Sequence, residues 1–323
     1  MMQGNPRAII TALLTMMLMV VIPVDTAQAV GSSATQETGI LRSLTSSTGI
    51  ADSQAPEGGA KVVVFGDSHA SGTNTPFRVD ERGCLKGAQS WPAQLQSIQG
   101  LARGELIDLS CNGASIDSTG FHFSDEVRHA ETRSAIGPRT EHIFIQFGKN
   151  DHWGHSATNL RHSVINCLFD LAHGCGDRAV AAGTMQDPAA VTGEHYAERM
   201  KPVIDYLEYY APDAEITLLG YQEYMPRTGG EICVRVGGTE IRKPDASALV
   251  SYMNQLENAI KDASEILEVD HLDLREATAG HSSCSADPWV NGVLDQRVDA
   301  VGGTWHPSPK GDSVTAGLLA DRM

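Results

Sequence analysis

Short apolar runs alternate along this chain with segments in which apolar residues recur every three or four positions. The run from Val62 to Phe65 contains β-branched valines and is typical of a short strand buried on both faces. Strands and helices in alternation predict an α/β fold, with a central parallel sheet covered by helices on both faces. The other predicted strands are 106–109, 142–147, 215–219 and 269–274, and the predicted helices are 91–98, 158–172, 194–210, 245–267 and one after residue 307.

Residues 120–139 have no clean period and are rich in His, Ser, Glu and Arg. Two interpretations are open, a lid over a site and an exposed loop. We favour the loop, because most long loops carry no chemistry that a sequence reveals.

The N-terminus is typical of a cleaved secretory signal. Arg7 precedes an uncharged run from Ala8 to Ile22, and Ala27-Gln28-Ala29 places small residues at the spacing that a signal peptidase needs. A transmembrane anchor is the alternative, but the run is shorter than the ~20 residues that span a bilayer and is broken by Pro23 and Asp25.

Three regions follow from this pattern. We predict a signal peptide at 1–29 and a secreted protein without a stable membrane anchor. Residues 30–59 are mostly Ser, Thr, Gly and Gln, which bury too little surface to offset their ordering entropy, so a flexible leader is expected there. Residues 60–323 form the folded domain. A net charge of −16 argues against a nucleic-acid partner, since phosphate neutralisation needs Lys and Arg.

The chain has an even number of cysteines, which in an exported protein indicates disulfides. About fifteen pairings are possible. We predict pairing of neighbours in sequence, because each bond then closes a loop within a local unit: Cys84 with Cys111, Cys167 with Cys175, and Cys233 with Cys284.

Four stretches carry side chains that suit acyl transfer. Ser68 follows a strand and a glycine, so it lies at the sheet edge where α/β proteins bind ligands, although Gly-Asp-Ser is also ordinary turn chemistry. Gly113 and Asn150 each come after another strand, and His306 lies near the C-terminus. Acyl transfer needs a hydroxyl, a base and donors for the oxyanion. We predict Ser68 and His306 as catalytic residues, and Ser68 N–H, Gly113 N–H and the Asn150 side chain as the oxyanion hole.

These stretches resemble the four sequence blocks of the SGNH hydrolase family, also called the GDSL esterases and lipases. Gly66-Asp67-Ser68 is similar to the nucleophile block, Gly113 to the glycine block, Gly148-Lys149-Asn150-Asp151 to the Gly-x-Asn-Asp block, and His306-Pro307 to the histidine block. The resemblance extends from Lys61 to the C-terminus. It implies a three-layer α/β/α flavodoxin-like fold and hydrolysis of carboxylic esters without a metal.

A second set of residues narrows the resemblance. His281-Ser282-Ser283-Cys284, the segment Pro288-Trp289-Val290-Asn291-Gly292 and the cysteine count are similar to the secreted actinobacterial lipase/esterase branch. The expected substrate is a small-molecule or lipid ester. We predict no cofactor and no metal site, and we expect a monomer.

The chain departs from the family pattern at two positions. The family usually has an aspartate three residues before the histidine, where this chain has Gly303. We predict that the backbone carbonyl of Gly303 accepts the second N–H of His306, with Asp299 as the alternative. His69 stands where an aromatic residue is common, and we interpret it as a wall residue rather than a second base.

Several polar and aromatic residues near these blocks are expected to have structural roles only. We interpret His152 and His155 as solvated loop residues, because no carboxylate or cysteine ligand pattern accompanies them. Lys149 is expected to be an exposed cation, and Trp305 is expected to pack against the sheet.

Two other functions compete with ester hydrolysis. Asp67-Ser68-His69 also matches the opening of dimetal phosphoesterases, but no Gly-Asp-x-x-Asp and no Gly-His-x-His motif follows it. A non-catalytic secreted binding domain on the same fold is the second alternative, since fold alone does not imply chemistry.

Overall fold

The computed structural model describes residues 54–155, 158–170 and 172–323. The predicted signal peptide and most of the predicted leader lie outside these residues. The end of the leader is described and contacts the domain: Ala55 N–H donates to the carbonyl of Arg133 (3.2 Å), and Arg139 N–H donates to the carbonyl of Gly58 (2.8 Å). The folded domain therefore starts earlier than the predicted boundary at residue 60.

Within the described ranges, no helix combines the length and the apolar character needed to cross a membrane.

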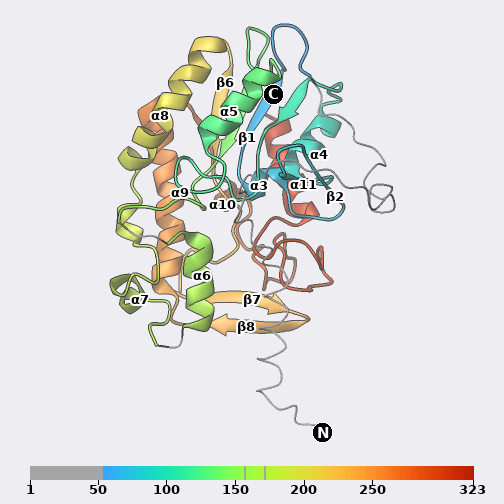
Figure 1. Ribbon diagram of the computed structural model, residues 1–323. Helices are drawn as coiled ribbons and strands as arrows, with labels where there is room; N and C mark the ends of the chain where they lie inside the picture. The colour runs from blue at the N-terminus through green and yellow to red at the C-terminus, as the bar shows by residue number, and fades with distance from the viewer. Residues whose placement is uncertain (1–53, 156–157, 171) are drawn as a thin grey trace, which may run out of the picture. The chain divides into compact units, whose positions relative to one another are not determined.

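A five-stranded sheet forms the centre of the domain (Figure 1). All four pairs of neighbouring strands are parallel. The order β4-β1-β5-β6-β9 puts the first and third sheet strands of the chain side by side, which is the 2-1-3-4-5 order of doubly wound flavodoxin-like sheets. The predicted fold is therefore confirmed. The strands are β1 (Val62–Gly66), β4 (Leu106–Asp108), β5 (His142–Gln146), β6 (Glu215–Leu219) and β9 (Asp270–Leu272).

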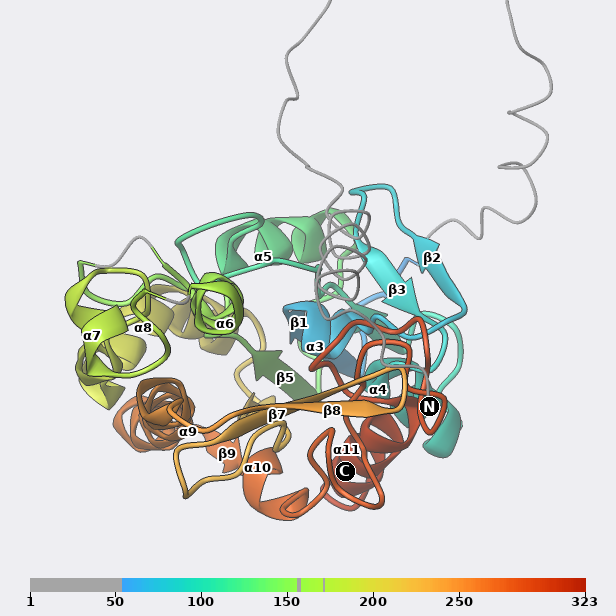
Figure 2. The same ribbon diagram turned by 90° about the horizontal axis from the view of Figure 1, so that it is seen from below.

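Helices cover both faces of this sheet, which explains why every residue of β1 is buried. Side chains alternate along a strand, so Val63 and Phe65 belong to the core on one face and Val62 and Val64 to the core on the other. Figure 2 shows the two helical layers on opposite sides of the sheet. One layer contains α5 (Phe123–Thr132), α8 (Gly193–Tyr210) and α9 (Ser247–Leu267), and the other contains α4 (Trp91–Ile98) and α11 (Pro309–Ala320).

The segment predicted as a loop, 120–139, contains helix α5, so that prediction is wrong. Phe123, Val127 and Ala130 recur at steps of four and three and are buried, and the Phe123 ring packs on Phe65 with centroids 5.3 Å apart. The Asp125 side chain accepts the N–H of His122 and caps the first turn. Charged residues on the outer face hide this short apolar stripe in the sequence.

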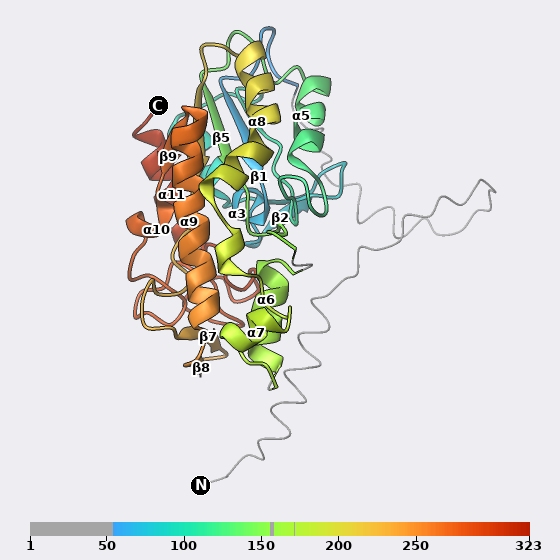
Figure 3. The same cartoon turned by 90° about the vertical axis from the view of Figure 1, so that its left-hand side faces the viewer.

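Two antiparallel hairpins lie outside the predicted elements. The hairpin β7–β8 has a two-residue turn, residues 237–238, because Val236 pairs with Thr239. Figures 1 and 3 show this hairpin together with α6 and α7 beyond the end of the sheet at which α3 lies. The remaining elements are α3 (Ser68–Ser71), β2 (Phe77–Val79), β3 (Leu85–Gly87), α6 (Leu160–Phe169), α7 (Asp177–Ala181), the 3-10 helix η1 (Pro188–Ala190), β7 (Ile232–Val236), β8 (Thr239–Lys243) and α10 (Leu274–Ala277).

Three disulfides cross-link the domain, and they are the three pairs predicted from the sequence. Cys84–Cys111 joins the β2–β3 hairpin to the loop after β4, Cys167–Cys175 joins α6 to the turn before α7, and Cys233–Cys284 joins β7 to the segment after α10. Each bond closes a loop within a local unit.

Candidate active site

Ser68 is the first residue of the short helix α3, at the carboxyl end of β1. Gly66 ends β1 where there is no room for a side chain, since a Cβ there would lie 2.9 Å from the carbonyl oxygen of Gln146 on β5. Asp67 caps α3 by accepting the N–H of His69 (2.8 Å). The half-buried Ser68 hydroxyl therefore lies where β1 and β5 meet, at the switch point of the sheet.

His306 lies in the loop before α11 and contacts Ser68. Its Nε2 is 2.7 Å from Ser68 Oγ, and its Nδ1 is 3.0 Å from the carbonyl oxygen of Thr304. A carbonyl only accepts, so the geometry assigns the ring proton to Nδ1 and leaves the Nε2 lone pair facing the hydroxyl. This is the tautomer that a base for Ser68 needs.

The histidine-orienting carbonyl belongs to Thr304 and not to Gly303, so the sequence prediction is corrected by one residue. The Gly303 carbonyl instead accepts the backbone N–H of His306 (3.1 Å) and closes a turn. A Cβ at position 303 would lie 2.9 Å from His306 Nδ1, so the ring occupies the space that a side chain would need. Asp299 does not serve either, because its carboxylate accepts the N–H (2.5 Å) and the hydroxyl (2.9 Å) of Thr75.

The structure brings the two further predicted oxyanion donors to neighbouring loops. Gly113 is exposed and has a φ of +79°, a conformation that glycine adopts without strain. The Asn150 side chain lies against the same loop and donates to the carbonyl of Ala114 (2.9 Å). Strands β4 and β5 flank β1, so the loops that follow them leave the sheet at the same edge as Ser68.

Comparison with known proteins agrees with this geometry. The family model for GDSL-like lipases and acylhydrolases matches residues 64–314. The chain belongs to this family. An esterase of Streptomyces scabiei is 24% identical over 313 residues, covering 83% of this chain and 87% of that protein. A lipase of Streptomyces rimosus is 23% identical over 252 residues, covering 78% and 82%.

Solved structures show the same fold. A phospholipase A1 from Streptomyces albidoflavus NA297 superposes with a TM-score of 0.60 at 19% identity, covering 82% of this chain and 99% of that chain. The extracellular lipase of Streptomyces rimosus gives a TM-score of 0.55 at 18% identity, covering 81% and 99%. The chain is thus a GDSL-family carboxylic ester hydrolase by family membership, with the fold of these enzymes.

In this GDSL hydrolase, a buried ion pair holds the loops after β4 and β5 together. The Asp151 carboxylate accepts the N–H of Ile116 (3.0 Å) and the hydroxyl of Ser118 (3.2 Å), and it pairs with Arg199. Burial raises the pKa of Asp151 to about 6, although the guanidinium of Arg199 opposes this shift. The sequence does not predict this contact, because Arg199 lies on α8, far from Asp151 along the chain.

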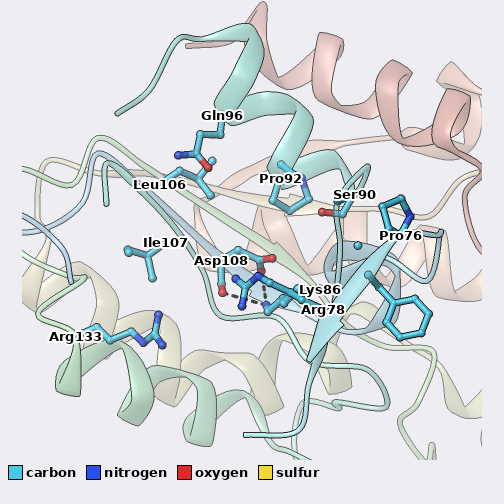
Figure 4. Close-up of a pocket in the computed structure, with 14 residues that line it drawn as sticks. Pro76, Arg78, Lys86, Ser90, Pro92, Gln96, Leu106, Ile107, Asp108 and Arg133 are labelled. Atoms are coloured by element: carbon cyan, nitrogen blue, oxygen red, sulfur yellow. Dashed lines mark hydrogen bonds and ion pairs between the residues drawn. The ribbon is translucent and has the colours of Figure 1, made fainter. Parts of the chain in front are cut away.

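The β2–β3 hairpin fixes the backbone that leads to Gly113. Lys86 Nζ donates to the carbonyls of Ser110 (2.6 Å) and Asp108 (3.0 Å), and Arg82 donates to the carbonyl of Leu109 (2.9 Å). Figure 4 shows Lys86 and Asp108 in a pocket of about 430 Å³ at the open edge of β4. Neither Ser68 nor His306 lines this pocket. The β2–β3 hairpin connects the two regions, because its Lys86 lines the pocket and also binds the backbone that leads to Gly113.

Removal of the Cys84–Cys111 disulfide is expected to lower both stability and turnover of the GDSL hydrolase. The double serine variant loses a bond across 27 residues, which corresponds to about 3 kcal/mol of unfolding free energy. It also releases the loop that carries Gly113, so kcat should fall more than KM changes. Urea unfolding and steady-state kinetics measure both effects.

The matched control is the double serine variant of Cys167–Cys175, which links α6 to the turn before α7. It should lose stability and keep kcat. An equal loss of kcat in both variants would contradict a special role for Cys84–Cys111.

The residues near the site that were predicted to have structural roles only differ in their exposure to solvent. His152 is half-buried and His155 is exposed. Trp305 packs against the core, as predicted. The prediction for Lys149 is wrong, since its side chain is buried with 4% exposure. His69 is buried and stacks on the ring of His306 with centroids 4.4 Å apart.

Proposed function

We propose that this chain is a secreted serine ester hydrolase in which Ser68 is the nucleophile and His306 its general base. The observation that carries the proposal is the 2.7 Å contact between His306 Nε2 and Ser68 Oγ, with Nδ1 held by Thr304. Ser68 Oγ forms a bond to the ester carbonyl carbon while its proton moves to Nε2. His306 then gives that proton to the departing alcohol, and water releases the acid by the reverse sequence.

The negative oxygen of the tetrahedral intermediate needs donors that are in place before the reaction. We assign this role to the N–H groups of Ser68 and Gly113 and to the amide of Asn150. An amide nitrogen has two hydrogens, and the bond to the Ala114 carbonyl orients the group while using one of them. The Asp151–Ile116 contact supports the same loops from the buried side.

Export is supported by the N-terminal sequence pattern and by the three disulfides, which persist in oxidising compartments. The similar proteins carry the names esterase, lipase and phospholipase A1. These names support an ester of a small molecule or a lipid as the substrate.

A fluorophosphonate probe tests the proposal directly. We expect covalent labelling of Ser68, identified by peptide mass spectrometry, and no labelling in Ser68→Ala. Hydrolysis of p-nitrophenyl esters of rising chain length should be insensitive to EDTA. An unlabelled, inactive protein would indicate the non-catalytic binding domain, and chelator-sensitive cleavage of a phosphodiester would indicate the dimetal enzyme.

A further inference from the structure

A buried polar cluster lies directly behind the candidate base. The rings of His69 and His306 stack with centroids 4.4 Å apart and planes 25° apart. At the edge of the His69 ring, Lys149 Nζ is 2.7 Å from His69 Nε2. Exposure is 5% for His69 and 4% for Lys149, so both groups are almost completely removed from water.

The cluster is held from three other positions in the fold. His69 Nδ1 lies 3.3 Å from the Asp67 carboxylate, which also accepts the hydroxyl of Tyr221 (2.7 Å). Lys149 Nζ lies over two aromatic rings, 4.0 Å from the ring centroid of Tyr221 and 3.4 Å from that of Tyr224. Aromatic faces attract cations, so these contacts favour the ammonium form of Lys149. His69 Nε2 also lies 3.3 Å from the carbonyl oxygen of Trp305, so this ring nitrogen faces both that carbonyl and the Lys149 amino group.

We propose that His69 and Lys149 are positioning residues for His306. The stacked ring of His69 fixes the plane of the His306 imidazole, and the buried ammonium of Lys149 opposes protonation of His306 in acidic solution. This inference rests on the proposed function of His306 as a base. It gives a role to His69, which stands where an aromatic residue was expected, and to Lys149, which was expected to be exposed.

The charges around the cluster agree with this assignment. Burial, together with the charges of His69 and Lys149, lowers the pKa of His306 to about 3, while the Thr304 carbonyl and Asp67 oppose the shift. Burial and Lys149 also lower the pKa of His69, against the effect of Asp67.

Lys149 is itself surrounded by groups from several elements. Burial lowers its pKa well below the ordinary value; Asp67 and Glu257 on α9 counteract this, and Arg275 on α10 adds to it. None of these groups replaces the carboxylate that the family pattern places three residues before the histidine. The cluster behind His306 therefore contains the His69 ring and the Lys149 amino group, with the Asp67 carboxylate opposing their effect.

The sign of the effect on activity follows from the role of the base. Only neutral His306 accepts the Ser68 proton, so the acid limb of kcat/KM follows the pKa of His306 in the free enzyme. Removing the nearby positive charge raises that pKa and moves the limb to higher pH. We expect Lys149→Met to shift the limb upward by about one pH unit, a tenfold loss of kcat/KM on the limb itself.

Substitutions of His69 separate positioning from charge. His69→Phe keeps a ring against His306, so it should keep most of the kcat at the pH plateau, whereas His69→Ala should lose it. Lys61→Met is the matched control, because Lys61 is half-buried just before β1 and pairs with the exposed Glu141 (3.4 Å), at the opposite end of this strand from Ser68. Its acid limb should coincide with that of the native enzyme.

An NMR titration of the His306 ring in Ser68→Ala protein reads the base without any turnover. Its midpoint should rise when Lys149→Met is added, and Lys149→Gln is the second variant if Lys149→Met does not fold. An unchanged midpoint in a folded variant, or equal plateau kcat in His69→Phe and His69→Ala, would overturn the inference. A shifted midpoint in a protein that hydrolyses no ester would instead refute the proposed function.

Discussion

Alanine at Ser68 is expected to lower kcat on a soluble p-nitrophenyl ester by about 10⁵- to 10⁶-fold, the largest effect of any single change in this protein. The hydroxyl supplies the atom that bonds to the substrate, and no neighbouring group replaces it. His306→Ala should cause a similar loss, since the hydroxyl is a poor nucleophile without the base 2.7 Å away.

The double variant Ser68→Ala/His306→Ala should be no slower than either single variant, because two residues that act as one unit are lost together. A double variant slower by the product of the two single losses would show that the residues act independently.

Ser71→Ala is the matched control on the same short helix. The Ser71 hydroxyl is buried and has no hydrogen-bond partner within the described residues, so its removal costs no interaction there. Near-native kcat in Ser71→Ala would tie the loss in Ser68→Ala to the nucleophile rather than to damage of α3.

The central sheet could be predicted from the sequence because its strands are buried on both faces. Runs such as Val62 to Phe65 and the strand 215–219 have few other interpretations, and their order along the chain leaves few topologies. The same pattern did not predict helix α5 or the two hairpins. Their apolar positions are few, and α5 is recognisable mainly through the sheet on which Phe123 packs.

The sequence predicted the parts of the candidate site that directly follow strands. Ser68, Gly113 and Asn150 follow adjacent strands, and because these strands are parallel, the three residues lie at one edge of the sheet. The carbonyl that orients His306 depends on the turn between Gly303 and His306, in which Trp305 has a φ of +58°, and no pattern of residue types fixes such a turn.

The burial of Lys149 depends on residues far along the chain. Tyr221 and Tyr224 follow β6, more than 70 positions after Lys149, and their rings cover its amino group. A lysine between a glycine and an asparagine is ordinarily exposed. Only the folded structure reveals that this one lies behind the base.

The second large effect is expected at Asn150. The imidazolium that forms during attack has the Thr304 carbonyl at Nδ1 and no carboxylate there, so stabilisation of the oxyanion should carry a larger share of the rate. Asn150→Ala should lower kcat by about 100- to 1,000-fold with little change in KM, because the amide is aimed at charge that exists only in the transition state.

Asp299→Asn is the matched comparison, because it tests whether Asp299 is the carboxylate of a catalytic triad with Ser68 and His306. The Asp299 carboxylate binds Thr75, so this change should cost little in kcat, in contrast to the about 10,000-fold loss that follows neutralisation of a triad aspartate. Both variants are measured on one soluble ester at the same pH. A severe defect in Asp299→Asn beside a mild one in Asn150→Ala would reverse the roles assigned to the two residues, because the carboxylate would then have to reach His306 during turnover and the amide would contribute only structure.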